Sequence, residues 1–391
     1  MKLLLICEST YIKESGGRVV RYITKLLNNE NIQIKILVVS KPRDDYEFDS
    51  FYKDNDVIFL PIPLKFWYRM INIFLLTKEN IFFKNLLINY RPDVVHFASF
   101  DHTKPSKFIS LSNRYGAKVI LQPWTMHFYC AQGFGFRNNK LCIECAKSGF
   151  FKALKYKCIS WKNLPSQIER FFLRSRALRD STILSSNIDL DKILNIYGIN
   201  SSKIKRFPIP FDCDFLEIPK DNSTSEYFIY YGQVNSHKGI NVLLNVFDNL
   251  TNLNLKIFPL SNFNLTTFNK NIEIHNGISW NNGLKDAVIN AKVVIFPSLW
   301  SSSTEYALCE ALLLKKPVIV FNVGVHKHLF INRYNAMVIQ PGDYEGFSNA
   351  VIELNENQFL RETIGENGYN TIRNINKPNI LSKEILSIYN E

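Results

Sequence analysis

The sequence of 391 residues contains no apolar run long enough to span a membrane as a helix. It also has no long Gly/Ser-rich or Pro-rich tract, and a hydrophobic content of 46% predicts a chain that is globular throughout. The apolar stretch within residues 1–10 is too short for a signal peptide, so we expect a first β-strand there, in a cytoplasmic protein. In that compartment the seven cysteines are reduced thiols or metal ligands, not disulfides.

Positive charge is in excess, because 47 Lys and Arg residues against 35 Asp and Glu residues leave a formal charge of +12. This excess favours an anionic partner: a phosphorylated substrate, an anionic membrane surface or nucleic acid. Nucleic acid is the least favoured, since the sequence has no RNP-like motif, zinc-finger helix or recognition-helix pattern. Residues 64–92 and 147–179 interleave basic and aromatic residues. This pattern fits a surface on anionic lipid, and for 147–179 a lipid head group or a diphosphate is the candidate partner. For 64–92 the alternative, a helix pair packed into the core, is slightly favoured.

Short apolar segments alternate with helix-like segments in both halves of the chain, as strands and helices do in parallel sheets. We therefore predict an α/β protein with two Rossmann-like, doubly wound domains facing a cleft. The N-terminal domain is placed at 1–215, with a cysteine-containing insertion at about 128–180. The C-terminal domain is placed at 216–375, and a helix over 376–391 is expected to pack back towards the N-terminal domain.

The most informative stretch is 292–325, which reads as strand, serine-rich loop, helix and strand. In open parallel sheets, ligands bind beyond the carboxyl ends of the strands, where helix N-termini present free N–H groups to anions. The loop 298–304 is therefore expected to hold a phosphate or a sugar. Glu310, about one and a half turns into the helix, is placed to accept hydrogen bonds from a ribose diol. The alternative is an ordinary buried crossover with a solvated glutamate.

Two further loops place glycine between a strand and a helix. The first follows the apolar run 3–7 and contains Ser15–Gly16–Gly17, and the second follows 227–231 and contains Gly232 and Lys238–Gly239. Glycine lets the backbone approach an anion closely, and a lysine at a helix N-terminus can meet a diphosphate. Both loops therefore predict phosphate contacts, with simple turns and a surface lysine as the alternatives.

Four cysteines form an array with the spacing C-x11-C-x2-C-x12-C in basic, loop-like sequence: Cys130, Cys142, Cys145 and Cys158. Four thiolates with a central CxxC can close a tetrahedral zinc site or hold an iron–sulfur cluster. Unliganded thiols are the equal alternative, because the spacing is looser than in a zinc ribbon. The remaining cysteines, Cys7, Cys213 and Cys309, lie in apolar segments and are expected in the core.

Taken together, these residues resemble the GT-B-fold retaining glycosyltransferases (glycosyl transferases group 1), which use nucleotide-activated sugars. The strongest part is PSLWSSSTEYALCEALLLKKPVIVFNVG at 297–324, with its proline, serine, loop and Glu-Ala. Gly232 with Lys238–Gly239, Ser15–Gly16–Gly17 and Phe207–Asp212 are similar to further elements of the family. The resemblance implies transfer of a sugar from a nucleoside diphosphate to a hydroxyl with retention, and no catalytic metal.

The resemblance also implies the roles of single residues. Lys238 would neutralise the donor diphosphate, Glu310 would hold the ribose, and His127 is the candidate for a catalytic imidazole. The residues expected at the donor are Gly16, Gly17, Gln233, Lys238, Ser302, Ser303, Thr304, Glu305 and Glu310. The acceptor would be a glycan or a lipid-linked precursor of a surface polysaccharide or glycolipid, at the inner face of the membrane.

Three positions depart from the family's pattern. Ser302 stands where the first of two glutamates is usual, Gln233 replaces an arginine, and Trp124 occupies the position of a histidine, with His127 three residues later. Glu305 lies close enough to substitute for the missing glutamate, although in a different register. These replacements support one alternative, a non-catalytic sugar-nucleotide-binding protein of the same fold, and a sugar-nucleotide epimerase is another.

Overall fold

The computed structural model divides the chain into two compact units, which are described separately. Unit 1 comprises Met1–Gly135, Cys142–Phe211 and Pro378–Glu391, and unit 2 comprises Phe136–Leu141 and Asp212–Lys377. The predicted boundaries were at 215 and 375. The structure describes residues 1–391 with the exception of 12–13, 29, 43–48, 64–70, 72–75, 99–105, 127–128, 139, 149–150, 164–166, 168–173, 175, 177–180, 217–225, 264–268 and 304.

Unit 1 is built on a seven-stranded sheet with the order β3-β2-β1-β4-β5-β8-β9, in which all pairs are parallel. Its strands are β1 (Lys2–Cys7), β2 (Gln33–Val38), β3 (Asp56–Phe59), β4 (Val94–Phe97), β5 (Lys118–Leu121), β8 (Thr182–Ser185) and β9 (Ile204–Arg206). The central strands β1 and β4 are mostly apolar, with His96 of β4 as a polar exception, because helices cover both faces of a parallel sheet.

The helices of unit 1 are α1 (Ser15–Leu27), α2 (Ser50–Asp54), α4 (Lys78–Tyr90), α5 (Ser106–Arg114), α6 (Glu144–Ser148), α7 (Phe151–Lys155), α9 (Ile188–Ile196) and α16 (Pro378–Asn390), with short 3-10 turns η3 (Trp161–Asn163) and η4 (Ser201–Lys203). The alternation of side chains along β4 sorts them between the two faces. Phe97 packs in one core with Phe83 of α4 and Phe108 of α5. Between Val95 and Phe97, His96 faces the other way and contacts Tyr389 of α16.

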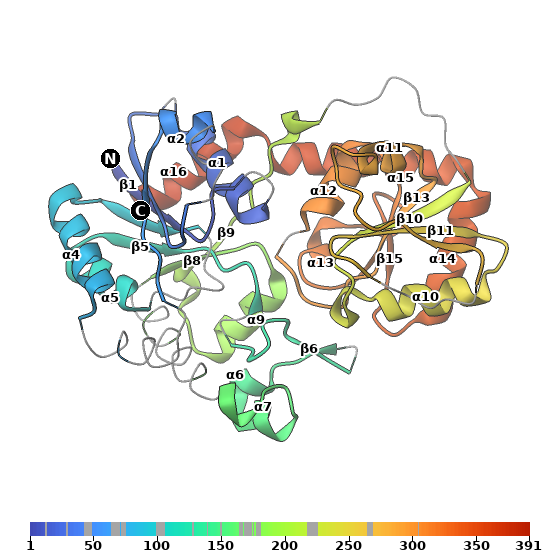
Figure 1. Ribbon diagram of the computed structural model, residues 1–391, viewed down its shortest axis with the longest axis horizontal. Coiled ribbons are helices and arrows are strands. Elements are labelled where there is room, and N and C mark those ends of the chain that lie inside the picture. Colours follow the sequence, from blue (N-terminus) through green and yellow to red (C-terminus); the bar gives the residue numbers. More distant parts are fainter. Residues whose placement is uncertain are drawn as a thin grey trace. The chain divides into compact units, whose positions relative to one another are not determined.

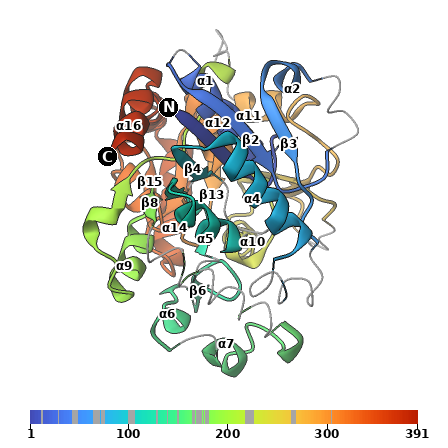
Figure 2. The ribbon, with the colours of Figure 1, turned by 90° about the vertical axis from the view of Figure 1, so that its left-hand side faces the viewer.

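The C-terminal helix α16 is thus part of unit 1, although most of unit 2 lies between α16 and the rest of unit 1 in the sequence (Figures 1 and 2). Tyr389 Oη lies 2.8 Å from His96 Nδ1, and Lys118 Nζ donates a hydrogen bond to the carbonyl of Ile388. Burial lowers the pKa of His96 to about 3, so that its ring is neutral at pH 7. These contacts hold the end of the chain against the sheet.

Unit 2 is built on a six-stranded parallel sheet with the order β12-β11-β10-β13-β14-β15. Its strands are β10 (Tyr227–Gly232), β11 (Asn254–Pro259), β12 (Ile272–Ile274), β13 (Val293–Phe296), β14 (Val318–Phe321) and β15 (Met337–Ile339), and the hairpin β6 (Phe136–Arg137) with β7 (Lys140–Leu141) is grouped with this unit. Its helices are α10 (Ile240–Asn249), α11 (Leu284–Asn290), α12 (Tyr306–Leu313), α13 (His326–Leu329), α14 (Tyr344–Glu356) and α15 (Gln358–Ile375), with 3-10 turns η5 (Cys213–Phe215) and η6 (Ser236–Lys238).

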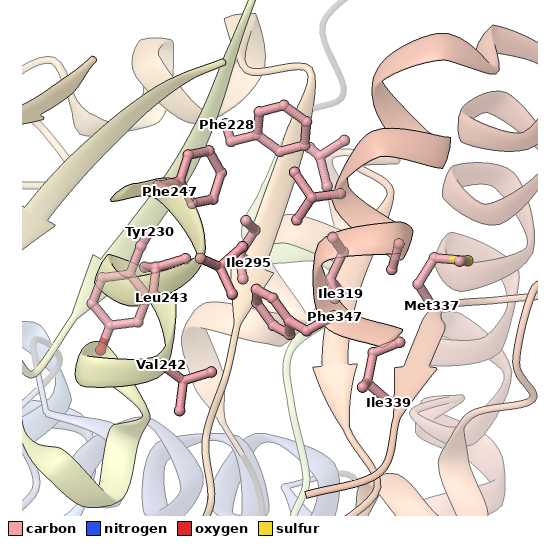
Figure 3. Close-up of a cluster of buried hydrophobic side chains, with 14 of the residues drawn as sticks. Phe228, Tyr230, Val242, Leu243, Phe247, Ile295, Ile319, Met337, Ile339 and Phe347 are labelled. Carbon is pink, nitrogen blue, oxygen red and sulfur yellow. The ribbon is translucent and has the colours of Figure 1, made fainter. Parts of the chain in front are cut away.

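The core of unit 2 shows the same sorting by strand alternation. Phe228 and Tyr230 of β10 point into a cluster with Phe247 of α10 and Phe347 of α14 (Figure 3). Tyr231 points the other way, and its hydroxyl donates a hydrogen bond of 2.5 Å to the carbonyl of Ala307 in α12. Helices therefore cover both faces of this sheet as well. The predicted α/β class with two Rossmann-like units is confirmed, and no helix in the described part of the chain is long and apolar enough to cross a membrane.

Candidate functional site

The candidate site of unit 2 lies beyond the carboxyl ends of two neighbouring strands, β10 and β13. The remaining strands follow outwards from this pair in opposite directions, β11 and β12 beside β10 and β14 and β15 beside β13. This reversal is the topological switch point, where the loops on either side diverge and leave room for a ligand. Lys238 is in the loop after β10, and the serine-rich loop follows β13.

A glycine allows the two loops to touch. Gly239 has φ of 77°, and a Cβ atom at this position would lie 1.8 Å from the carbonyl oxygen of Pro297. The amide of Leu299 also donates a hydrogen bond of 2.9 Å to the carbonyl of His237. A side chain at 239 would force the loops apart, so the lysine beside Gly239 is fixed relative to the serine-rich loop.

Lys238 and Glu305 form an ion pair at the centre of this contact. Lys238 Nζ lies 2.7 Å from Glu305 Oε1, and the lysine and glutamate side chains are 17% and 5% exposed. The same oxygen accepts hydrogen bonds from Ser298 Oγ at 2.5 Å and Trp300 Nε1 at 3.4 Å. In the family's sequence pattern, Glu305 is out of register with the glutamate that Ser302 replaces. In the folded chain, however, its carboxylate lies beside Lys238.

The carboxyl of Glu305 stays ionised although it is buried. Burial acts to raise its pKa, but the charges of Lys238 and His326, with hydrogen bonds from Lys238 and Ser298, outweigh burial and lower the pKa below its ordinary value. An ammonium group has three N–H donors. Lys238 therefore keeps donors for a further anion after pairing with Glu305.

His237 and Trp300 flank the lysine. Lys238 Nζ lies 4.9 Å from the centroid of the Trp300 ring, which is edge-on to His237 at 5.8 Å between centroids. Burial and the charge of Lys238 lower the pKa of His237 to about 4. The imidazole is therefore neutral at pH 7, and Lys238 carries the local positive charge.

The serine-rich loop is packed against the loop after β14. Ser301, Ser302 and Ser303 are buried. The amide of Val325 donates a hydrogen bond of 3.0 Å to the carbonyl of Ser302, and Gly324 has φ of 53° where a Cβ would lie 2.5 Å from that carbonyl oxygen. The main chain of Ser302 thus fixes the position of the serine-rich loop relative to the loop after β14.

His326, at the start of α13, is a further group at this edge. It is fully buried, and its Nδ1 lies 3.0 Å from the carbonyl oxygen of Phe321. In the part of the chain that the structure describes, its Nε2 has no hydrogen-bond partner. Burial lowers the pKa of His326, while the charge of Glu305 opposes that shift. The sequence prediction missed His326, although it follows the carboxyl end of β14, and it placed Ser298 in the expected ligand loop without giving this residue a role.

The other predicted residues are placed as follows. Glu310 is buried in α12, and the carbonyl of Gln233 accepts a hydrogen bond from the Tyr230 hydroxyl. Gly16 and Gly17 begin α1 in unit 1, and a Cβ on Gly17 would lie 2.1 Å from the carbonyl oxygen of Tyr11. His127 and Thr304 lie outside the described residues.

The four cysteines of the array all lie in unit 1. Cys145 packs with Ala131 and Ala153 in a small cluster that Cys158 joins. Burial raises the pKa of Cys145 to about 11, and charges on the thiols of Cys130, Cys142 and Cys158 act in the same direction. No group of three or more His, Cys, Asp or Glu residues within the described ranges is arranged to hold a metal ion. Metal binding by these cysteines stays a prediction.

Comparison with known proteins identifies the fold and the family. HepE from Anabaena, solved in complex with UDP, aligns over 99% of this chain and 99% of its own with a TM-score of 0.69 and 12% identity. At that identity the likeness shows the fold, which is GT-B. Residues 214–371, most of unit 2, form a domain of the family Glycosyl transferases group 1.

Two curated relatives match parts of the chain. The capsular polysaccharide biosynthesis glycosyltransferase CapM of Staphylococcus aureus is 25% identical over 228 residues, 53% of this chain and 58% of CapM. The UDP-Gal:alpha-D-GlcNAc-diphosphoundecaprenol alpha-1,3-galactosyltransferase of Escherichia coli is 26% identical over 107 residues, 26% of this chain and 27% of its own length. The match thus spans just over half of the first relative and about a quarter of the second.

Proposed function

We propose that this protein is a retaining glycosyltransferase that moves a sugar from a nucleoside diphosphate to a hydroxyl group during assembly of a surface polysaccharide or glycolipid. The observation that carries the proposal is the position of Lys238 at the switch point of unit 2, within a group 1 domain. CapM, a relative over part of the chain, acts in capsular polysaccharide biosynthesis by its name.

In the proposed reaction the bond between the anomeric carbon and the diphosphate oxygen breaks, and its electron pair stays on the diphosphate. The acceptor oxygen forms the new bond to the same face of that carbon, and the hydroxyl proton passes to the departing diphosphate. Negative charge therefore develops at the leaving group, where a fixed cation is most effective. Lys238, held by Glu305 at 2.7 Å, supplies that charge without having to be reorganised.

Glu305 is proposed to position Lys238, in place of the glutamate that Ser302 replaces. Glu310 is proposed to bind the donor ribose, and the backbone of the serine-rich loop to line the sugar. A second cation is lacking at Gln233, so the diphosphate would depend more strongly on Lys238. Gly16, Gly17 and His127 stay predictions for the donor site and for catalysis.

We propose a uridine diphosphate sugar as the donor. HepE has been solved with UDP-glucose, and the name of the Escherichia coli relative specifies UDP-Gal as its donor. The name of that relative also describes an acceptor on diphosphoundecaprenol. By extension, a lipid-linked acceptor at the cytoplasmic face of the membrane suits a chain with a net charge of +12.

The proposal is tested by mixing the purified chain with UDP-glucose, UDP-galactose, GDP-mannose and ADP-glucose and measuring nucleotide release with and without acceptor lipids. Slow release of UDP without acceptor, and faster release with it, is the expected result. Binding of UDP with no release under either condition would instead support the non-catalytic alternative that Ser302 and Gln233 favour. Conversion of the donor to a different UDP-sugar would identify an epimerase.

We propose no catalytic metal, and a structural zinc ion or iron–sulfur cluster at the four-cysteine array. Elemental analysis of the purified chain tests the second proposal, with about one zinc per chain expected. Cys142→Ser should lower that content, whereas Cys309→Ser, in a buried helix of unit 2, should not. A metal content of zero in the unsubstituted protein would identify the four residues as free thiols.

A further inference from the structure

Two large aromatic side chains of unit 1 stand in solvent next to the cysteine cluster. Phe151, the first residue of α7, is 74% exposed, and Trp161, the first residue of η3, is 73% exposed. Leaving so much apolar area in water is unfavourable unless a partner covers it.

The backbone that carries these two residues is internally hydrogen-bonded. The amide of Cys158 donates to the carbonyl of Ala153 at 2.8 Å, and Gln132 Nε2 donates to the carbonyl of Cys158 at 3.0 Å. Ala153 is fully buried in the cluster around Cys145. In α7, the side chain of Ala153 thus faces inwards while that of Phe151 faces outwards. The segment 151–161 therefore has an inner and an outer side.

The segment is also strongly basic. Residues 144–163 contain five lysines and one acid, Glu144, which gives a local charge of +4. Glu144 is paired with Lys152 at 3.7 Å. The other four lysines are exposed and, among the residues that the structure describes, form no ion pair: Lys147, Lys155, Lys157 and Lys162.

We infer that the outer side of this segment, defined by Phe151, Trp161 and these four lysines and called the α7–η3 surface, binds an anionic lipid bilayer. Trp and Phe insert at the level of the head groups, and lysines beside them are attracted to anionic lipids. Each such lysine strengthens binding about fivefold. The inference goes beyond the proposed transfer reaction, because it concerns unit 1 and holds whichever donor unit 2 binds.

A bilayer fits this surface better than a macromolecular partner. A stable protein interface needs a contiguous apolar centre from which charges are depleted, whereas here Lys155 and Lys157 lie between Phe151 and Trp161 in the sequence. Nucleic acid would be bound by stacking platforms along a groove, and this surface consists of two short helical turns. A flat anionic layer can accept separated aromatic side chains and scattered positive charges together.

The test is co-sedimentation of the full chain with vesicles of phosphatidylcholine, with and without phosphatidylglycerol. We expect binding that requires phosphatidylglycerol. Phe151→Ala/Trp161→Ala should weaken it at least about tenfold, and Lys155→Glu/Lys162→Glu about 25-fold or more, since two charges are reversed. All of these side chains are exposed, so thermal unfolding and UDP binding should be unchanged.

Two matched controls separate this surface from general effects. Leu260→Ala/Phe359→Ala removes exposed apolar residues from unit 2, and Lys270→Glu/Lys377→Glu makes the same change in net charge in that unit. Both should bind vesicles as the unsubstituted chain does. Absence of vesicle binding, an equal loss in either control, or binding of RNA in preference to vesicles would overturn the inference. None of these outcomes would affect the test of nucleotide release.

Discussion

Lys238 in unit 2 and Lys162 in unit 1 carry the same charge in opposite surroundings. Lys238 is 17% exposed and paired with a buried glutamate, whereas Lys162 is exposed on a 3-10 turn. A buried, paired charge has a fixed position and little screening, and so it suits a ligand whose atoms must be placed accurately. An exposed lysine has no fixed position. It can attract an oppositely charged surface, which does not need accurate placement of single atoms, over about a Debye length. Burial, more than charge, separates their roles.

The buried position of Lys238 is expected to depend on the close backbone contact between Gly239 and Pro297. Gly239→Ala combines a positive φ with a contact of 1.8 Å to Pro297, and should destabilise unit 2 by roughly 3 kcal/mol or more. Gly277→Ala is the matched control, because Gly277 has φ of 74° with nothing within 4 Å of its Cβ. It should cost only about 1 kcal/mol. Differential scanning fluorimetry that gives both variants the same melting temperature would contradict the role of the close contact.

The next largest effect is expected at the charge itself. Lys238→Ala removes the cation from the leaving-group site, and kcat/KM for sugar transfer should fall on the order of 100-fold. Lys256→Ala removes a lysine of β11 that pairs with Glu273 of β12; it is the control and should leave transfer unchanged. Steady-state rates of UDP release measure both. A Lys238 variant with normal kcat/KM would refute its assignment to the diphosphate.

Unit 1 offers a buried polar pair that has a structural role. Tyr389→Phe removes the hydroxyl 2.8 Å from His96 and leaves a buried ring nitrogen without that partner. We expect a loss of about 1–3 kcal/mol in stability, seen as a lower melting temperature and as earlier proteolysis of α16. If the melting temperature is unchanged, the hydrogen bond does not hold α16 in place. Nucleotide binding by unit 2 should be retained.

The smallest effect is a pH dependence at His237. Its pKa is about 4 in the folded chain and 6.5 in the unfolded chain, so the unfolded state binds a proton first as pH falls. The stability it contributes is complete above pH 6.5 and is lost between pH 6.5 and 4. Since His237 is partly exposed, the loss is on the order of 1 kcal/mol. His237→Gln should flatten melting temperature against pH in this window, and an identical slope in both proteins would exclude the effect.

Much of the fold could be predicted from local pattern. The apolar runs 3–7 and 227–231 are short and precede turn residues, and both are found as strands, within β1 and β10. The Lys238–Gly239 loop and the helix with Glu310 were also placed correctly, whereas Ser15–Gly16–Gly17, expected in a loop, form the first turn of α1. Strand–loop–helix order is encoded within about thirty residues, but the start of a helix is less sharply defined. The two-unit α/β fold follows from this repetition.

What the sequence could not determine is which side chains meet across strands. Glu305 and Lys238 are paired because β10 and β13 are neighbours, and that strand order is a property of the whole sheet. For the same reason His326 comes within range of Glu305, and Tyr389 meets His96 although 293 residues separate them. The exposure of Phe151 and Trp161 likewise depends on what packs inwards around Cys145. Periodicity fixes the local conformation of a segment, but burial and pairing are decided by the packing of segments distant in sequence.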